Sequence, residues 1–187
     1  MIIKKLKKTF IYRTYFKWRY VNPRIFNQQT PLKNEISFLK TFLNKKSIIF
    51  DIGANHGDKT EAFQKLGKLV IAFEPDKTNL DFLNFRFYNN SKVIVVNKAL
   101  SNEISRTTFY VNNHGSGLNT IDKKRQEEAN FKISYMVKTT TIDQMINKFG
   151  KPDFVKIDVE GHELKVLIGL SQKIDTIVFE ANFTEFR

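Results

Sequence analysis

The sequence predicts an α/β fold in which a mostly parallel β-sheet carries helices on both faces. From residue 47 onward, short β-branched and apolar runs alternate with segments whose apolar residues recur every three or four positions. The chain has 187 residues, 41% of them hydrophobic and 27% charged, which is enough for one domain with its own core. It has no cysteine, which excludes disulfides and cysteine-ligated metal sites.

The first half of the alternating region consists of strand–helix steps. Each predicted strand is a short β-rich run, and each predicted helix places apolar residues on one side before a stop signal such as Gly67. A preceding helix is expected after Pro31, because its apolar residues share one helical face: Ile36, Leu39, Phe42 and Leu43. The elements expected here are a helix over 32–43, a strand over 47–52, a helix over 57–66, a strand over 69–73, a helix over 78–87 and a strand over 92–96.

The second half opens with a more polar stretch and returns to apolar strands. The segment 122–130 is polar throughout and predicts a surface helix, whereas 154–159 predicts a strand buried on both faces. The elements expected here are strands over 107–111 and 137–141, helices over 122–130, 142–149 and 163–170, and strands over 154–159 and 176–180. In such a fold the ligand binds at the carboxyl ends of the parallel strands.

Residues 1–46 form a basic and aromatic extension ahead of the 47–187 domain. The formal net charge is +12, but nine basic residues and no acidic residue precede Glu35, which leaves 22 basic against 19 acidic residues in the remainder. Residues 1–24 interleave these cations with apolar and aromatic side chains at roughly helical spacing. Packing on the domain, peripheral contact with an anionic membrane and nucleic-acid binding stay open, and nucleic acid is the least favoured.

No apolar stretch approaches the roughly 20 residues of a membrane span, and the apolar run of a signal peptide is missing too. We therefore expect a cytoplasmic protein, with residues 1–24 as the segment that would touch a membrane.

A glycine-containing loop follows the first strand of the domain and begins the next helix. Gly53 and Gly57 allow a tight turn and close approach to a ligand, and the following helix offers unpaired N–H groups. Asn55 stands where a nicotinamide-cofactor loop would have its middle glycine, so that class of cofactor is disfavoured. Asp51 suits a ligand that carries a positive charge.

Glu74 ends the second strand of the domain, 21 residues after Gly53. Its two oxygens can accept hydrogen bonds from both hydroxyls of a ribose. Asn97 and Ala99 follow the third strand and would line an adenine region, although Ala99 also suits the core.

Charged residues interrupt the buried strand 154–159 and crowd its carboxyl end. Burial of Lys156 and Asp158 is costly unless they pair or serve a ligand, and both share one face of the strand. Asp158, Glu160 and His162 then gather where chemistry is expected. A metal site is disfavoured because a fourth ligand is missing, and general-base work by His162 fits its pKa range better.

Five strings in this order resemble the FkbM-type methyltransferases, a branch of the class I S-adenosylmethionine-dependent methyltransferases. The resemblance spans residues 47–180, and its strings are FDIGANHG, AFEP, NKALS, TTTID and DFVKIDVEGHE. It implies a Rossmann-like three-layer sandwich and S-adenosylmethionine as cofactor, held by Asp51, Gly53, Asn55, Gly57, Glu74, Asn97 and Ala99. It places Asp158, Glu160 and His162 at the reaction centre without assigning their individual roles.

The implied reaction is O-methylation of a hydroxyl on a sugar, glycan or specialised metabolite. We expect His162 to be the base, oriented by Asp158 or Glu160, and the loop from His114 to Leu118 to shape the acceptor pocket. The other hypothesis is a non-catalytic module with this cofactor fold, associated with a membrane or RNA through the basic arm. Intact DIGANHG and KIDVEGHE strings argue against lost catalysis.

The family's sheet continues past the last strand with an antiparallel hairpin, whereas seven residues remain here after Glu180. We expect a five-stranded parallel core in the order 3-2-1-4-5 without that hairpin. A shortened sheet, a fragment and a partner subunit over the open edge all stay open as explanations. Because an uncovered edge strand invites pairing, we expect a tendency to form homodimers.

Overall fold

The computed structural model describes residues 36–112, 118–131 and 133–180. The chain divides into two compact units, residues 1–38 and 39–187, and the predicted strand–helix alternation falls in the second. Residues 1–35, 113–117, 132 and 181–187 lie outside the described part, so the predictions for the basic arm and for His114 lie outside it too. In the described part, no helix has the length and apolar character needed to cross a membrane.

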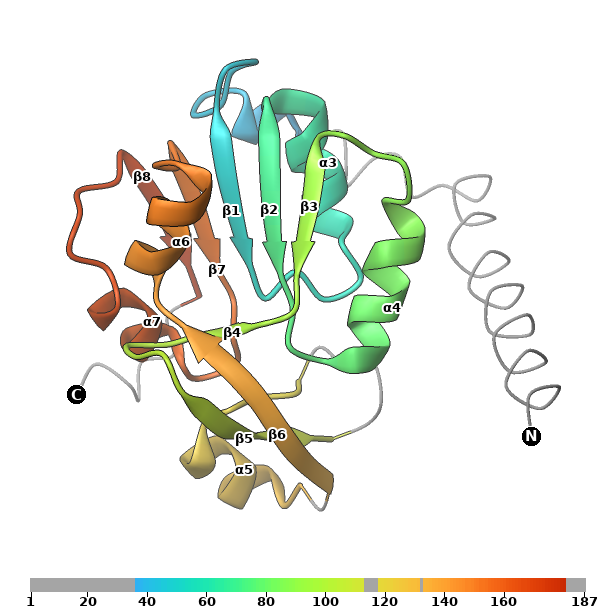
Figure 1. The fold of residues 1–187 in the computed structure, drawn as a ribbon, viewed down its shortest axis with the longest axis vertical. Helices are drawn as coiled ribbons and strands as arrows, with labels where there is room; N and C mark the ends of the chain where they lie inside the picture. The colour runs from blue at the N-terminus through green and yellow to red at the C-terminus, as the bar shows by residue number, and fades with distance from the viewer. Residues whose placement is uncertain (1–35, 113–117, 132, 181–187) are drawn as a thin grey trace, which may run out of the picture. The chain divides into compact units, whose positions relative to one another are not determined.

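The centre of the second unit is a five-stranded parallel sheet in the order β3-β2-β1-β7-β8, as the sequence predicts. Figure 1 shows its strands side by side with all carboxyl ends at the same edge. The strands are β1 (Ile48–Ile52), β2 (Leu69–Phe73), β3 (Val93–Val96), β7 (Phe154–Ile157) and β8 (Thr176–Phe179).

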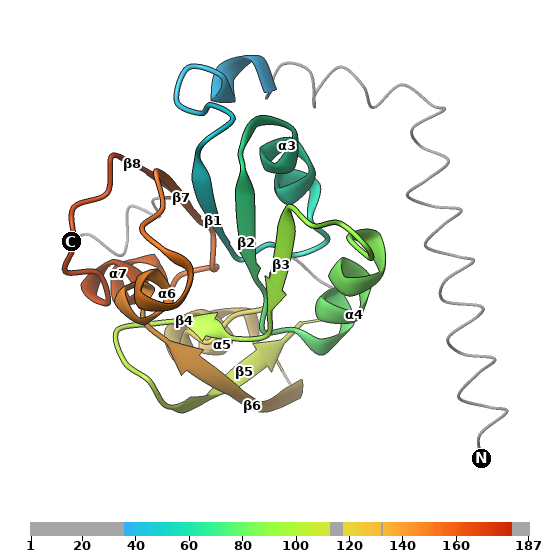
Figure 2. The same ribbon diagram turned by 45° about the horizontal axis from the view of Figure 1, so that its top comes forward.

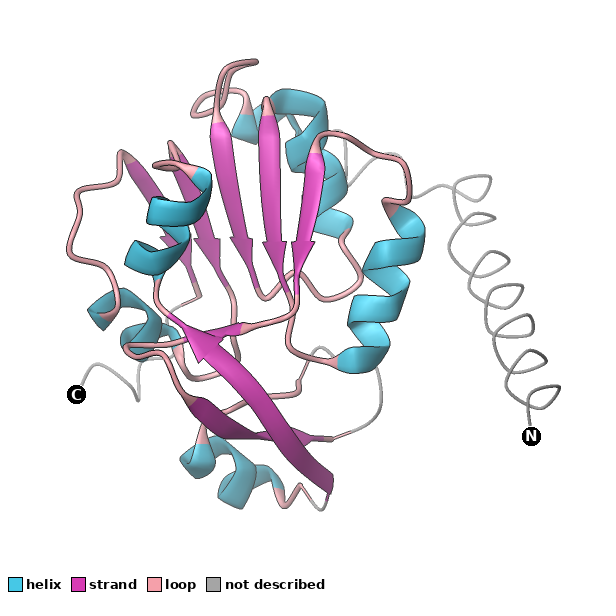
Figure 3. Ribbon diagram, viewed as in Figure 1, coloured by secondary structure: helices cyan, strands magenta, loops and turns pink. Residues whose placement is uncertain are grey.

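Helices cover both faces of this sheet, which gives the three predicted layers (Figure 3). On one face, Phe50 and Phe73 pack in a core with Ile142 and Val166 from two of these helices. On the other face, the Phe63 ring lies 5.5 Å from the Phe154 ring. The helices are α3 (Asp58–Leu66), α4 (Lys77–Arg86), α6 (Ile142–Phe149) and α7 (Glu163–Ile168).

The helix predicted over 32–43 ends earlier than expected. Within the described residues it covers only 36–39, and the chain then forms turns in which Leu39 accepts bonds from the N–H groups of Phe42 and Leu43. Leu39 and Leu43 are both buried, as their spacing predicts, whereas Phe42 is 44% exposed.

A second, three-stranded sheet crosses the carboxyl edge of the first (Figures 1 and 2). Its order is β4-β6-β5, and the β5–β6 pair is antiparallel. The sequence predicts two of its strands as isolated extended pieces but not the sheet itself, and it leaves Ala99 and Leu100 unassigned to a strand. The strands are β4 (Ala99–Leu100), β5 (Arg106–Val111) and β6 (Ile133–Thr140), with surface helix α5 (Lys123–Ala129) between the last two.

Candidate functional site

A pocket opens at the carboxyl ends of β1, β2 and β7, where the topology predicts a ligand. Its floor is formed by the loops that follow these strands, and its other walls come from the second sheet and from residues 119–121. Of the residues predicted for this site, those that line the pocket are Gly53, Asn55, Glu74, Ala99, Asp158 and Glu160. The structure thus brings together residues more than 100 positions apart in the chain.

The loop after β1 is held in a conformation that ordinary residues avoid. Gly53, Asn55 and Gly57 all have positive φ, at 77°, 49° and 80°. A Cβ on Gly53 would meet the backbone of Asp158, and one on Gly57 would meet the side chains of Leu83 in α4 and Phe87 directly after it. Both glycines therefore make room for other parts of the protein. Gly53 also lines the pocket, as expected for close approach to a ligand, whereas Gly57 does not.

Glu74 is 5% exposed and fixes the geometry of two loops. Its Oε2 accepts a bond from the N–H of Asn55 at 2.7 Å, and its Oε1 accepts one from the N–H of Asp76 at 2.8 Å. Burial raises the pKa of Glu74 to about 7, although these two backbone donors lower it. Each oxygen keeps a further lone pair for a donor in the pocket.

Asn97 lies outside the pocket, whereas the sequence predicts that it lines an adenine region there. Its Nδ2 donates to the backbone oxygens of Glu74 at 2.9 Å and Pro75 at 3.3 Å, and it does not line the pocket. It braces the loop after β2 from outside. Ala99 does line the pocket, and it is also part of the small core with Phe109, as its apolar character allows. Its predicted place beside an adenine ring stays a prediction.

Asp51 lies beneath the site, fully buried, instead of on the pocket wall. Its Oδ2 accepts a bond from Thr60 Oγ1 at 2.5 Å, and its Oδ1 lies 3.6 Å from Lys156 Nζ. Lys156 also pairs with Asp158 at 3.2 Å, as the shared strand face predicts, and donates to the backbone oxygen of Gly53 at 2.9 Å. Asp51 and Lys156 therefore hold the loop after β1 in place, and the predicted direct contact between Asp51 and a cationic ligand has no support.

The loop after β7 is organised by Glu163, a residue to which the motifs assign no role. This carboxylate is 1% exposed and accepts bonds from the N–H groups of Val159 at 2.8 Å and Gly161 at 3.0 Å. It holds a turn in which Glu160 and Gly161 have φ of 58° and 98°. A glutamate in the first turn of a helix, two residues after a glycine, is a signal that could have identified it.

Glu160 projects from that turn into the pocket wall. Its carboxylate pairs with Arg125, and its backbone oxygen accepts a bond from Thr120 Oγ1 at 2.8 Å. Burial raises the pKa of Glu160, while Arg125 acts in the opposite direction. The segment between β5 and β6 is thereby tied to the loop after β7.

His162 does not lie on the pocket wall, and neither predicted carboxylate orients it. Its Nε2 lies 3.0 Å from Ser101 Oγ, and its Nδ1 is buried without a hydrogen-bond partner in the described part of the chain. Burial lowers the pKa of His162 to about 4, so the ring is neutral near pH 7 and a weak base.

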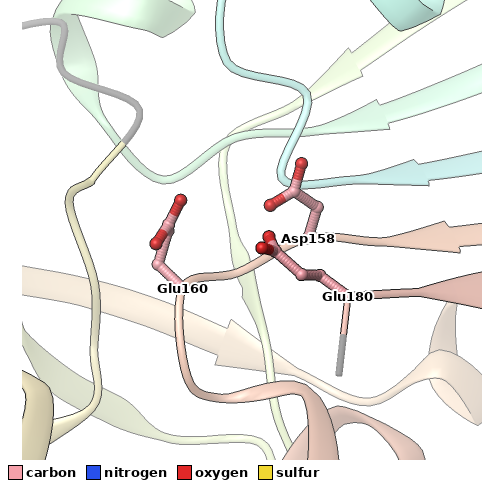
Figure 4. A group of neighbouring side chains, drawn as sticks. All are labelled: Asp158, Glu160 and Glu180. Atoms are coloured by element: carbon pink, nitrogen blue, oxygen red, sulfur yellow. The ribbon is translucent and has the colours of Figure 1, made fainter. Parts of the chain in front are cut away.

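Three carboxylates gather at the end of β7 and β8, as Figure 4 shows for Asp158, Glu160 and Glu180. One oxygen from each lies within 4.8 Å of the others. Two of them already have cationic partners, because Lys156 pairs with Asp158 and Arg125 with Glu160. The cluster concentrates negative charge beside the pocket.

Two buried amide oxygens at the pocket have no hydrogen-bond partner among the described residues. They are Oδ1 of Asn55 and Oδ1 of Asn79, and both residues line the pocket. Buried acceptors without donors are rare, because each loses its bonds to water. The pocket therefore presents unused acceptors together with the carboxylates of Glu74, Asp158 and Glu160. The motifs do not include Asn79, although a polar residue on the buried side of a helix is a signal that could have identified it.

A family model and a curated relative both match this chain, and both are methyltransferases. The profile of the methyltransferase FkbM domain matches residues 51–187. The hexuronic acid methyltransferase AglP of Haloferax volcanii is 27% identical over 139 residues, which cover 71% of this chain. The chain spans about half of that relative, 53% of its length.

Two solved structures are each similar to a part of this chain. A methyltransferase FkbM from Methylobacillus flagellatus is 21% identical, covers 66% of this chain and 28% of its own, and has a TM-score of 0.46. A proposed methyltransferase from Streptococcus mutans, in complex with SAH, is 25% identical over 37% of this chain and 40% of its own, with a TM-score of 0.33.

Proposed function

The chain belongs to the methyltransferase FkbM family, and on that basis we propose that it binds S-adenosylmethionine and methylates a hydroxyl group of a sugar-containing acceptor. The observation that carries the proposal is the position of Glu74, a buried carboxylate at the end of β2 that lines the pocket. Its free lone pairs suit the two neighbouring hydroxyls of a ribose.

The residues present fit this cofactor in two further respects. Asn55 and Asn79 offer buried amide oxygens that lack donors within the described residues, and the cofactor carries hydroxyl, amino and ammonium groups that can donate. Glu74 and Asp158 line the same pocket with carboxylates, which suits a ligand bearing an ammonium and a sulfonium. We assign Glu74 to the ribose and Asn55 to the methionyl end.

The bound cofactor supplies an already activated methyl group. The protein's part is to hold the acceptor oxygen in line with that methyl group, which contributes roughly 7–11 kcal/mol in well-oriented reactions. A proton must also leave the acceptor hydroxyl, and a positioned base contributes a factor of about 100 to 10,000.

We propose Glu160 as that base in place of His162. Glu160 lines the pocket and its pKa is raised by burial, which makes its carboxylate more basic than an exposed one. Arg125 holds the carboxylate in one orientation. His162 is a poorer base, because its pKa is lowered to about 4 and Nδ1 is buried.

A sugar acceptor is supported by the relative from Haloferax volcanii, which is a hexuronic acid methyltransferase. The part of the pocket wall that comes from the second sheet includes Phe109. We propose that the segment 118–125, tied to the loop after β7 through Thr120 and Arg125, forms one side of the acceptor site.

Calorimetric titration of S-adenosylhomocysteine into the full chain tests the cofactor assignment. Wild type and Glu128→Gln, a control on the exposed surface of α5, are expected to bind alike, whereas Glu74→Gln is expected to bind at least tenfold more weakly. A folded chain that gives no heat contradicts the proposal. Transfer of labelled methyl from S-adenosylmethionine to glycans with and without uronic acids then tests the acceptor class.

A further inference from the structure

The edge of the main sheet opposite the pocket carries a dense group of lysines. Because the five strands are parallel, their amino ends all lie at one edge, which is at the top in Figure 1. We call this the amino edge. It is formed by the turns that lead into each strand, and the pocket lies at the other edge.

The segments that lead into β1, β2 and β3, which include the last two residues of α3, are basic and contain no acidic residue. They cover residues 44–47, 65–68 and 88–92. Their lysines, here called the amino-edge lysines, are all exposed: Lys45, Lys46, Lys65, Lys68 and Lys92. The nearby Glu61 pairs with Lys65 at 3.5 Å, but it also pairs with Arg86 and is buried. The turns into β7 and β8 add Asp153 and Asp175, which Lys151 and Lys173 balance in charge. The group therefore keeps most of its positive charge.

A hollow lies among these lysines. It is lined by Lys45, Lys65 and Lys92, with the polar side chains of Gln64, Asn90 and Ser91 between them. Ammonium and amide donors around one concave surface suit phosphate oxygens.

Exposed aromatic rings accompany the lysines. Tyr88, in the turn between α4 and β3, is 78% exposed. Phe42 is 44% exposed and lies next to Phe154, the first residue of β7, with ring centroids 6.5 Å apart. Aromatic rings beside lysines are typical of proteins that rest on a membrane surface.

We propose that the amino edge of the sheet docks on an anionic membrane surface. Lipid headgroup phosphates and carboxylates would pair with the amino-edge lysines, while Tyr88 and Phe42 would enter the headgroup layer. Docking by this edge leaves the pocket facing away from the bilayer and open to an acceptor. The inference does not depend on the proposed methylation.

Vesicle co-sedimentation of the full chain tests this proposal. The edge variant combines Lys46→Glu, Lys68→Glu and Lys92→Glu. The control variant combines Lys123→Glu, Lys124→Glu and Lys138→Glu, exposed lysines of α5 and β6, and it changes the net charge by the same amount. Phosphatidylcholine vesicles with and without phosphatidylserine are compared at about 0.1 M salt, where the screening length is about 10 Å.

Each lysine near an anionic membrane contributes roughly fivefold in partitioning, so the edge variant is expected to bind at least about a hundredfold more weakly than wild type. The control variant is expected to stay close to wild type, and vesicles without phosphatidylserine are expected to retain little of any form. A milder triple Lys→Gln variant at the edge is expected to follow the edge variant, and unchanged circular dichroism shows that both are folded.

Equal losses in the edge and control variants would overturn the proposal, because net charge alone would then explain binding. Retention of the edge variant at the wild-type level would overturn it too. Edge-dependent binding of a single-stranded RNA, with no binding to phosphatidylserine vesicles, would assign the same lysines to nucleic acid instead.

Discussion

The backbone oxygen of Asp158 lies 1.8 Å from the point where a Cβ on residue 53 would stand. Gly53 and Asp158 come from the loops after β1 and β7, and these loops meet in backbone contact because position 53 has no side chain. This contact brings Asn55 to the same pocket as Glu160. The glycine of the DIGANHG string is thus explained by protein packing as well as by its φ of 77°.

Replacement of Gly53 by alanine should therefore be far more damaging than the same change at another glycine with positive φ. Gly150 is the matched control, because its φ is 92° and an added Cβ would meet only Ile48 Cδ1 at an ordinary 3.5 Å. Gly150 has ψ of 162°, so we expect Gly150→Ala to cost about 1–3 kcal/mol of unfolding free energy through backbone strain alone. Gly53→Ala adds the backbone clash and is expected to cost at least about 4 kcal/mol. Urea unfolding measures both, and equal losses would contradict the packing role.

Removal of the Lys156 ammonium should leave a buried charge without its partner. Lys156→Met takes away the ion pair with the fully buried Asp51 and the bond to the backbone oxygen of Gly53, and we expect a loss of about 3–5 kcal/mol. The double variant with Asp51→Asn should lose less than the sum of the two single variants. Lys123→Met, which breaks an exposed pair with Glu127, should cost no more than about 1 kcal/mol.

Affinity for S-adenosylhomocysteine should rise with pH through the neutral range. The pKa of Glu74 is raised to about 7, and ribose hydroxyls donate to the ionised carboxylate, so protonation at lower pH removes acceptors. We expect binding about tenfold weaker at pH 6 than at pH 8 in calorimetric titrations, because the competent fraction changes by that factor. Glu74→Gln should bind S-adenosylhomocysteine weakly at both pH values. A wild-type affinity that does not change with pH would contradict the prediction.

The raised pKa of Glu74 also affects the stability of the unliganded protein. A carboxyl group with a raised folded-state pKa binds its proton more tightly when folded, so the free energy of unfolding should fall as the pH rises from 4.5 through about 7. Urea unfolding across that range should show a steeper decline in wild type than in Glu74→Gln. A steeper decline in Glu74→Gln than in wild type would mean that Glu74 is ionised at lower pH than its burial implies.

Substitutions at Glu160 and His162 should separate the proposed base from a buried structural histidine. Glu160→Gln keeps the shape of the side chain, and we expect it to lower kcat at least about a hundredfold while S-adenosylhomocysteine binding changes little. His162→Gln should reduce stability through Ser101 but leave kcat within about threefold. The measurement is methyl transfer to the best acceptor of the glycan panel, and the opposite pattern would return the role of base to His162.

Much of the architecture could be predicted from local patterns. The alternation of strands and helices predicts the parallel strands, because parallel strands need crossover helices. The resemblance to the family implies their order, and the structure has that order. The end of each strand then marks Gly53, Glu74 and Asp158 as neighbours of one ligand site. These inferences need only residues close together in the chain.

Side-chain roles within the site could not be predicted in this way. The sequence shows Asp51 ahead of a glycine loop, but only the packing against Lys156 and Thr60 makes it a buried brace. His162 stands in a string full of acids, yet its partner is Ser101, 61 positions earlier. Local spacing cannot distinguish these cases, because the same residue types also occur at ligand-binding positions.

The main sheet, the edge at which a ligand binds and the family all follow from the amino-acid order alone, because periodicity and short motifs carry that information locally. The three-dimensional fold was needed to show that β4, β5 and β6 form a second sheet, that Arg125 holds Glu160 and that five lysines share the amino edge. The physical reason is that burial, ion pairing and charge density arise between residues that the fold, and not the chain order, makes neighbours.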